Sequence, residues 1–146
     1  MQLSGKKTSF ITKQTSNRMS DFLLEDIIGK YYKKEIDKET GFGTEFFLEV
    51  EEAEEGRLKF VFEMDTLGEF GKIGETWRGT GISRGDHLLF VVQQQENWVQ
   101  NGDERIGNEV EQQDILPIEA FPHFGKIVIY HKKINKLVTL DKKEED

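Results

Sequence analysis

Cysteine is absent from the sequence, and only two prolines occur among its 146 residues. Without thiols the chain has no disulfide framework, no thiolate nucleophile and no thiolate ligand for a metal. No apolar run approaches the roughly 20 residues that a membrane-spanning helix needs, so we expect no membrane insertion. The length suffices for one hydrophobic core. These features predict a soluble, cytoplasmic protein with a single folded domain.

Acidic residues are missing from the first 20 positions and abundant afterwards. The chain carries 20 basic and 28 acidic residues, and four of the basic ones lie in residues 1–20, so the remainder has a formal charge of −12. A body of this charge repels phosphate backbones, so we expect no nucleic-acid partner. It would attract a basic protein, although a net charge also serves solubility alone.

The two ends of the chain are predicted to lie outside the folded domain. Residues 1–19 are basic, rich in serine and threonine, and free of acidic residues. Two interpretations stay open for them: a disordered tail, with Met19 as the natural start, or an organellar transit peptide. Residues 142–146 are predicted to form a charged C-terminal tail.

A short helix is predicted over residues 20–28, directly before the first strand. Ser20 suits the N-cap position, and Leu23 and Ile27 stand four residues apart on one apolar face. Gly29 can end the helix by adopting a conformation that other residues avoid. An apolar helix that leads straight into a strand predicts a plug over one end of a barrel.

Most of the remaining chain has the patterns of short strands. In residues 57–66, for example, Phe60, Phe62 and Met64 alternate with polar residues, which is typical of a half-buried strand. The predicted strands cover residues 31–36, 44–53, 57–66, 75–83, 87–95, 108–120, 126–134 and 137–141. Short links between them favour an up-and-down barrel over a sandwich. We therefore predict an all-β, up-and-down antiparallel eight-stranded barrel over residues 20–141, with a short N-terminal capping helix.

The run of residues 22–32, FLLEDIIGKYY, resembles the N-terminal signature of the calycins, which include the lipocalins and the fatty-acid-binding proteins. In that signature a helical segment leads into Gly-x-Trp on the first strand. Gly29 stands at the glycine, and Tyr31 stands at the tryptophan. The resemblance implies that Tyr31 lies at the barrel floor against the helix. The last strands contain no arginine, so Lys132, Lys133 or Lys136 would have to cover this aromatic ring.

A barrel of eight strands leaves room for one small ligand, which favours a non-catalytic carrier of a hydrophobic molecule. Aromatic side chains would bury the ligand, and a few polar groups would orient it. The candidate ligand-binding residues are Tyr31, Phe60, Phe62, Met64, Trp77, Phe90, Gln94 and His131. The alternative is a core filled by these same side chains. No cofactor is expected.

A different function would use the outside of the barrel. Glu49, Glu51 and Glu55 lie close together on one predicted hairpin, where they would form an acidic docking surface for a basic protein, as in an inhibitor or immunity protein. An enzyme is the third possibility, but no catalytic motif is present and we assign no catalytic residue. The three histidines have no metal-ligand spacing, so no metal is expected.

Overall fold

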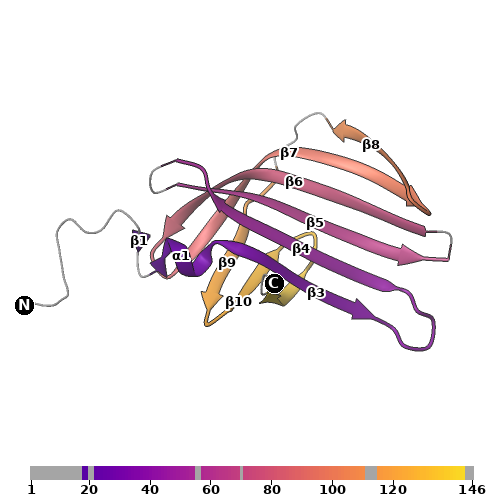
Figure 1. The fold of residues 1–146 in the computed structure, drawn as a ribbon, viewed down its shortest axis with the longest axis horizontal. Coiled ribbons are helices and arrows are strands. Elements are labelled where there is room, and N and C mark those ends of the chain that lie inside the picture. Colours follow the sequence, from indigo (N-terminus) through magenta and orange to yellow (C-terminus); the bar gives the residue numbers. More distant parts are fainter. Residues whose placement is uncertain (1–17, 20–21, 55–56, 70, 111–114, 144–146) are drawn as a thin grey trace, which may run out of the picture.

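A computed structural model of the chain describes residues 18–19, 22–54, 57–69, 71–110 and 115–143. The predicted basic tail, apart from two residues, and most of the predicted C-terminal tail lie outside this part. The described elements are β1 (Arg18–Met19), β2 (Phe22–Leu23), α1 (Leu24–Ile27), β3 (Gly29–Ile36), β4 (Gly43–Glu52), β5 (Leu58–Gly68), β6 (Gly71–Arg84), β7 (His87–Asn101), β8 (Glu104–Val110), β9 (Ile118–His123), β10 (Lys126–His131) and β11 (Lys136–Lys142). Figure 1 shows their arrangement.

The strands from β3 to β11 form one antiparallel sheet that closes on itself. Its order is β6-β5-β4-β3-β11-β10-β9-β7-β8, and a further pairing of β6 with β7 completes the ring. Strands β8 and β9 follow each other along the same edge of β7, because β8 pairs with its last residues and β9 with its first. They act as one interrupted strand. The predicted up-and-down antiparallel barrel of eight strands is therefore confirmed.

The wall of the barrel is tall on one side and short on the other. Strands β4 to β7 have 10 to 15 residues each, whereas β9, β10 and β11 have six or seven. The pairing of β11 with β3 spans only two residue pairs. The long strands consequently extend past the short ones, to the right in Figure 1, and leave part of their inner face uncovered.

At the closed end the barrel is filled by its own side chains. Phe60, Phe62, Trp77 and Phe90 are each at most 2% exposed. Ring centroids lie 5.0 Å apart for Phe60 and Phe90 and 5.6 Å apart for Phe62 and Trp77, which are distances of direct aromatic contact. These four residues therefore form a packed core and not the wall of an open cavity.

Several predicted elements differ from the structure in extent. The predicted strand 87–95 continues to Asn101 as β7, and the predicted strand 126–134 ends at His131 as β10. The helix spans only Leu24–Ile27, because Phe22–Leu23 pairs with Arg18–Met19 as a small antiparallel ladder. Residues 67–74, which fall between the predicted strands 57–66 and 75–83, are mostly strand, since β5 and β6 are joined by a tight hairpin after Gly68. No helix in the described part of the chain is long and apolar enough to cross a membrane.

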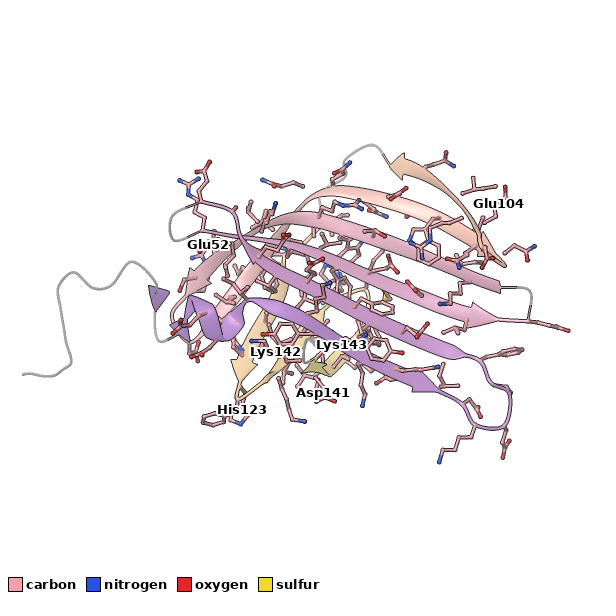
Figure 2. All side chains as sticks on the ribbon, in the orientation of Figure 1. Glu52, Glu104, His123, Asp141, Lys142 and Lys143 are labelled. Carbon is pink, nitrogen blue, oxygen red and sulfur yellow. The ribbon has the colours of Figure 1, made fainter. Side chains whose placement is uncertain are left out.

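Tyr31 ties the helix to the barrel. Its hydroxyl donates a hydrogen bond of 2.6 Å to the carbonyl oxygen of Ile27, and its ring is buried. Burial, with the charge of Asp26 as a smaller cause, raises the pKa of Tyr31 to about 12. The basic group over this ring is Lys142, at 6.0 Å, which also donates to the carbonyl oxygen of Asp26. The expectation that Lys132, Lys133 or Lys136 covers Tyr31 was wrong, because β11 places Lys142 beside α1 (Figure 2).

Replacing Gly29 by alanine should lower the free energy of unfolding by about 1–3 kcal/mol. Gly29 has a φ of 149°, which residues with a side chain rarely adopt, and a Cβ there would lie 2.6 Å from Cε of Lys142. Gly41→Ala is the matched control, since Gly41 also has a positive φ but nothing within 4 Å of its Cβ position. Urea unfolding measures both variants. The flexible end of Lys142 can move aside, so the backbone conformation is the main cause of the expected loss. A loss below about 0.5 kcal/mol for Gly29→Ala would contradict the prediction.

Candidate functional site

The uncovered inner face of the tall wall forms a groove of about 380 Å³. Its apolar part comes from directly paired positions on three neighbouring strands: Ile73 on β6, Val99 on β7 and Ile106 on β8. These side chains are 65%, 50% and 60% exposed. The other lining residues are Met64, Thr66, Gly74, Glu75, Asn97, Trp98 and Asn108. The groove thus combines an apolar wall with a few polar groups, which is typical of small-ligand sites.

A β-bulge in β7 decides which polar side chains face the groove. The register shifts between Arg78 and Gly79, so Gly79 pairs with Val92 while Arg78 pairs with Gln94. The bulge inserts one extra residue, and side chains after it change faces relative to a regular strand. Gln95 consequently faces the interior. Gln94, the predicted ligand-orienting residue, is exposed and lines a different groove on the outer face.

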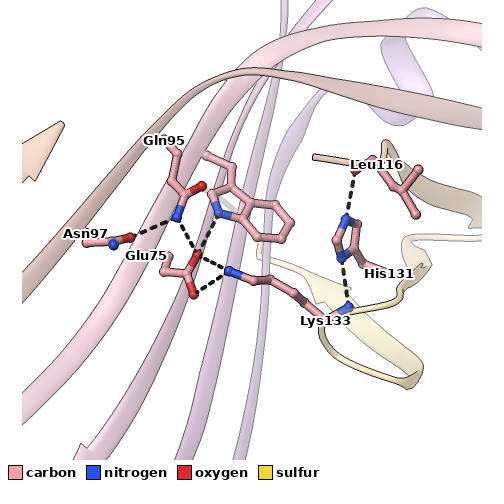
Figure 3. A network of polar contacts seen from close by, with 7 residues as sticks. Glu75, Gln95, Asn97, Leu116, His131 and Lys133 are labelled. Atoms are coloured by element: carbon pink, nitrogen blue, oxygen red, sulfur yellow. Dashed lines mark hydrogen bonds and ion pairs between the residues drawn. The ribbon is translucent and has the colours of Figure 1, made fainter. Parts of the chain in front are cut away.

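Glu75 is the centre of a polar network at the floor of the groove (Figure 3). Its Oε1 accepts hydrogen bonds from the indole of Trp77 at 3.1 Å and from the amide of Gln95 at 2.9 Å. Lys133, in the turn between β10 and β11, reaches across the barrel and donates to both carboxylate oxygens at 3.0 and 3.2 Å. Gln95 also donates to Oδ1 of Asn97 at 2.9 Å. The network therefore closes the packed core beneath the groove.

His131 stands beside this network, where it supports Trp77. Its Nδ1 accepts a hydrogen bond from the backbone amide of Lys133, so Nε2 carries the hydrogen and donates to the carbonyl oxygen of Leu116 at 2.8 Å. The ring meets Trp77 edge-on at 4.8 Å. Burial lowers the pKa of His131 below its usual range, which favours the neutral imidazole. His131 is thus bonded on both nitrogens inside the core.

The candidate ligand-binding residues fall into three places. Met64 lines the groove. Tyr31, Phe60, Phe62, Trp77, Phe90 and His131 lie in the core below it, and Gln94 lies outside the barrel. The residues that sequence reasoning missed are Ile73, Val99 and Ile106. None of the three lies within a predicted strand, because glycine stands beside Ile73 and Ile106, and Trp98 interrupts the alternation at Val99.

The acidic docking surface is only partly described. Glu49 and Glu51 line an outer groove of about 480 Å³, whereas Glu55 lies outside the described residues. The same groove contains Lys59 and Arg78, so basic groups stand beside the two glutamates. This part of the outer face is mixed in charge.

A second charged cluster, on the outer face of the tall wall, contains the buried carboxyl group of Asp65. This residue is 1% exposed. Glu63 stands two positions away on β5 and forms an ion pair of 3.2 Å with Arg105 on β8. Burial, together with the neighbouring charge of Glu63, raises the pKa of Asp65 to about 7. Arg105 also lies 3.6 Å from the ring centroid of Trp98 and thereby fastens β8 to the barrel.

Neither the grooves nor the clusters form a metal centre. Within the described residues, no three histidine or carboxylate side chains are grouped so that they could hold a metal ion. The chain matches no family model, no curated protein and no solved structure. Its fold and groove define it as an all-β barrel with an open, partly apolar mouth.

Proposed function

We propose that this protein binds a small, mostly hydrophobic molecule, without catalysis, in the groove at the open end of the barrel. The observation that carries the proposal is the contiguous exposure of Ile73, Val99 and Ile106 on a concave surface. Single exposed apolar side chains are normal, but three in direct cross-strand contact within a groove indicate a binding site. A volume near 380 Å³ lies at the small end of the range for ligand pockets.

The proposal places the ligand above the packed aromatic core and not within it. Phe60, Phe62 and Phe90 would then support the wall of the site, while Met64 would contact the ligand directly. Trp77 would affect ligand binding indirectly, because its indole donates a hydrogen bond to Glu75 at the floor of the groove. This differs from a lipocalin-like interior that holds its ligand deep among the aromatic rings.

We also propose that the barrel is calycin-like. The support is the arrangement at its closed end, where α1 precedes Gly29, Tyr31 lies buried against the helix, and Lys142 covers the ring. The calycin resemblance implies an aromatic residue at this position, packed on the capping segment under a basic side chain. A transport role would follow from such a scaffold.

The double replacement Ile73→Thr and Ile106→Thr should weaken binding of apolar fluorophores by at least about tenfold. Threonine keeps the β-branched shape but removes apolar surface from the groove. The matched control is Ile82→Thr with Leu137→Thr, since both residues are exposed apolar side chains outside the groove. Fluorescence titration measures the affinities. The absence of saturable one-to-one binding to the unmodified protein would contradict the proposed function.

A further inference from the structure

The polar floor of the groove contains one carboxylate whose cationic partner comes from a different part of the barrel. Glu75 projects from β6, and Lys133 reaches it from the turn after β10. The side chain of Lys133 is 49% exposed, and that of Glu75 is 25% exposed. An ion pair of this exposure contributes little net stability, because water solvates both groups well. Lys133 can therefore leave Glu75 at a small cost.

The two oxygens of Glu75 are unequally engaged. Oε1 accepts hydrogen bonds from Trp77, Gln95 and Lys133, whereas Oε2 accepts one from Lys133 at the longer distance of 3.2 Å. If Lys133 moved away, Trp77 and Gln95 would still hold the carboxylate in place. Its charge would then need a new cation, and Glu75 itself lines the groove.

We propose that the groove selects hydrophobic amines, whose ammonium group replaces Lys133 at Glu75 while the apolar part packs on Ile73, Val99 and Ile106. This inference rests on the proposed function and names its ligand class. An ammonium group offers the same charge and hydrogen-bond donors as Lys133, and the ligand adds apolar burial that Lys133 lacks. Lys133 is thus an internal substitute for the ligand's head group.

The charges around the groove disfavour an anionic ligand. A carboxylate ligand would approach the carboxylate of Glu75, and Lys133 is the basic group already neutralised there. The body of the protein also carries a formal charge of −12 outside residues 1–20, which repels anions at long range. A neutral alcohol would avoid this repulsion but would gain no ion pair.

The test uses three probes with one naphthalene ring system that bears an aminomethyl, a hydroxymethyl or a carboxylate group at the same position. Heteronuclear NMR of the isotopically labelled full chain reports the site, because the two tryptophan indoles give separate signals. The indole of Trp77 bonds to Glu75 and should shift on binding. Trp98 also lines the groove, and its indole, which donates to Thr76, serves as a second reporter that should shift less than that of Trp77. The amine should bind roughly tenfold more tightly than the alcohol, and the carboxylate most weakly.

Two variants separate the roles of the ion pair. Lys133→Met should tighten binding of the amine by several fold and leave that of the alcohol unchanged, because Glu75 loses its internal partner. Lys126→Met is the matched control, since it removes the same charge from an exposed pair with Asp141. Glu75→Gln should abolish the preference for the amine while the alcohol still binds, which also shows that the variant is folded.

The outcomes distinguish this inference from the function on which it rests. If no probe shifts the Trp77 indole in a saturable manner, the groove is not the ligand site and both proposals are overturned. If the alcohol or the carboxylate binds there as tightly as the amine, or if Glu75→Gln preserves the preference for the amine, only the ligand class is overturned. The expected order of affinities, lost in Glu75→Gln and enhanced in Lys133→Met, supports both.

Discussion

Trp77→Ala should lower the free energy of unfolding by about 3–5 kcal/mol, which is the range for removing a large aromatic side chain from a packed core. Trp77 has no exposed surface. Its ring contacts both Phe62, at 5.6 Å, and His131, at 4.8 Å, so it joins the tall wall to the short one. The substitution also removes the indole that donates to Glu75. Urea unfolding followed by circular dichroism measures the loss.

Two further variants show whether Trp77 acts through its packing. Trp77→Phe should lower the free energy of unfolding clearly less than Trp77→Ala does. Phenylalanine fills much of the space of the tryptophan ring, although it lacks the indole donor. Phe124→Ala should change the free energy of unfolding by less than about 0.5 kcal/mol, since this ring is 93% exposed. A loss below about 1 kcal/mol for Trp77→Ala would mean that the core collapses around the vacated space.

Asp65→Asn should make the protein more stable above pH 7 and flatten the pH dependence of its unfolding. The pKa of the Asp65 carboxyl is raised to about 7 in the folded state, chiefly by burial and then by the charge of Glu63. The titratable groups around it are Glu63 on the same strand and Tyr32, Glu45, Lys72 and Arg105 on other strands. Lys72 and Arg105 oppose the rise in pKa without cancelling it.

The direction of the pH dependence of stability follows from proton binding. Between the ordinary aspartate pKa of about 4 and the folded value of about 7, the folded state holds a proton that the unfolded state has released. The free energy of unfolding therefore falls as the pH rises through this window, and the contribution of Asp65 is most favourable at low pH. Asparagine has no such titration. We expect the change in unfolding free energy between pH 5 and pH 8 to shrink by roughly 1–3 kcal/mol.

Asp141→Asn is the matched control for this experiment. Its carboxyl is exposed, and the hydrogen bond from Lys126 holds its pKa below the usual range. Its titration thus affects stability only at more acidic pH, and the profile between pH 5 and pH 8 should resemble that of the unmodified protein. Equal profiles for Asp65→Asn and the unmodified protein would show that Asp65 is ionised throughout this range.

The barrel architecture could be predicted because it depends on local patterns. Alternation in residues such as Phe60, Phe62 and Met64 determines which face of each strand is apolar, and short turns between strands leave antiparallel pairing as the simple arrangement. The interrupted strand was predicted only in part, since the single strand predicted over residues 108–120 contains the end of β8 and the start of β9.

The site was harder to predict because it depends on the bulge and on relative strand length. Gln94 and Gln95 are adjacent glutamines. A regular alternation that continued from Val92 would point Gln94 into the barrel. The register shift opposite Arg78 and Gly79 points Gln95 into the barrel instead. A pairing irregularity of this kind involves two strands, so the sequence of one strand does not reveal it.

The all-β class and the helical segment before Gly29 follow from the sequence, because apolar periodicity and turn chemistry act over a few neighbouring residues. The aromatic packing at the closed end and the groove at the other end follow from the way the strands assemble into the barrel. The physical reason is distance along the chain. Glu75 and Lys133 meet across the barrel although 58 residues separate them, and the closure of the ring alone brings them together.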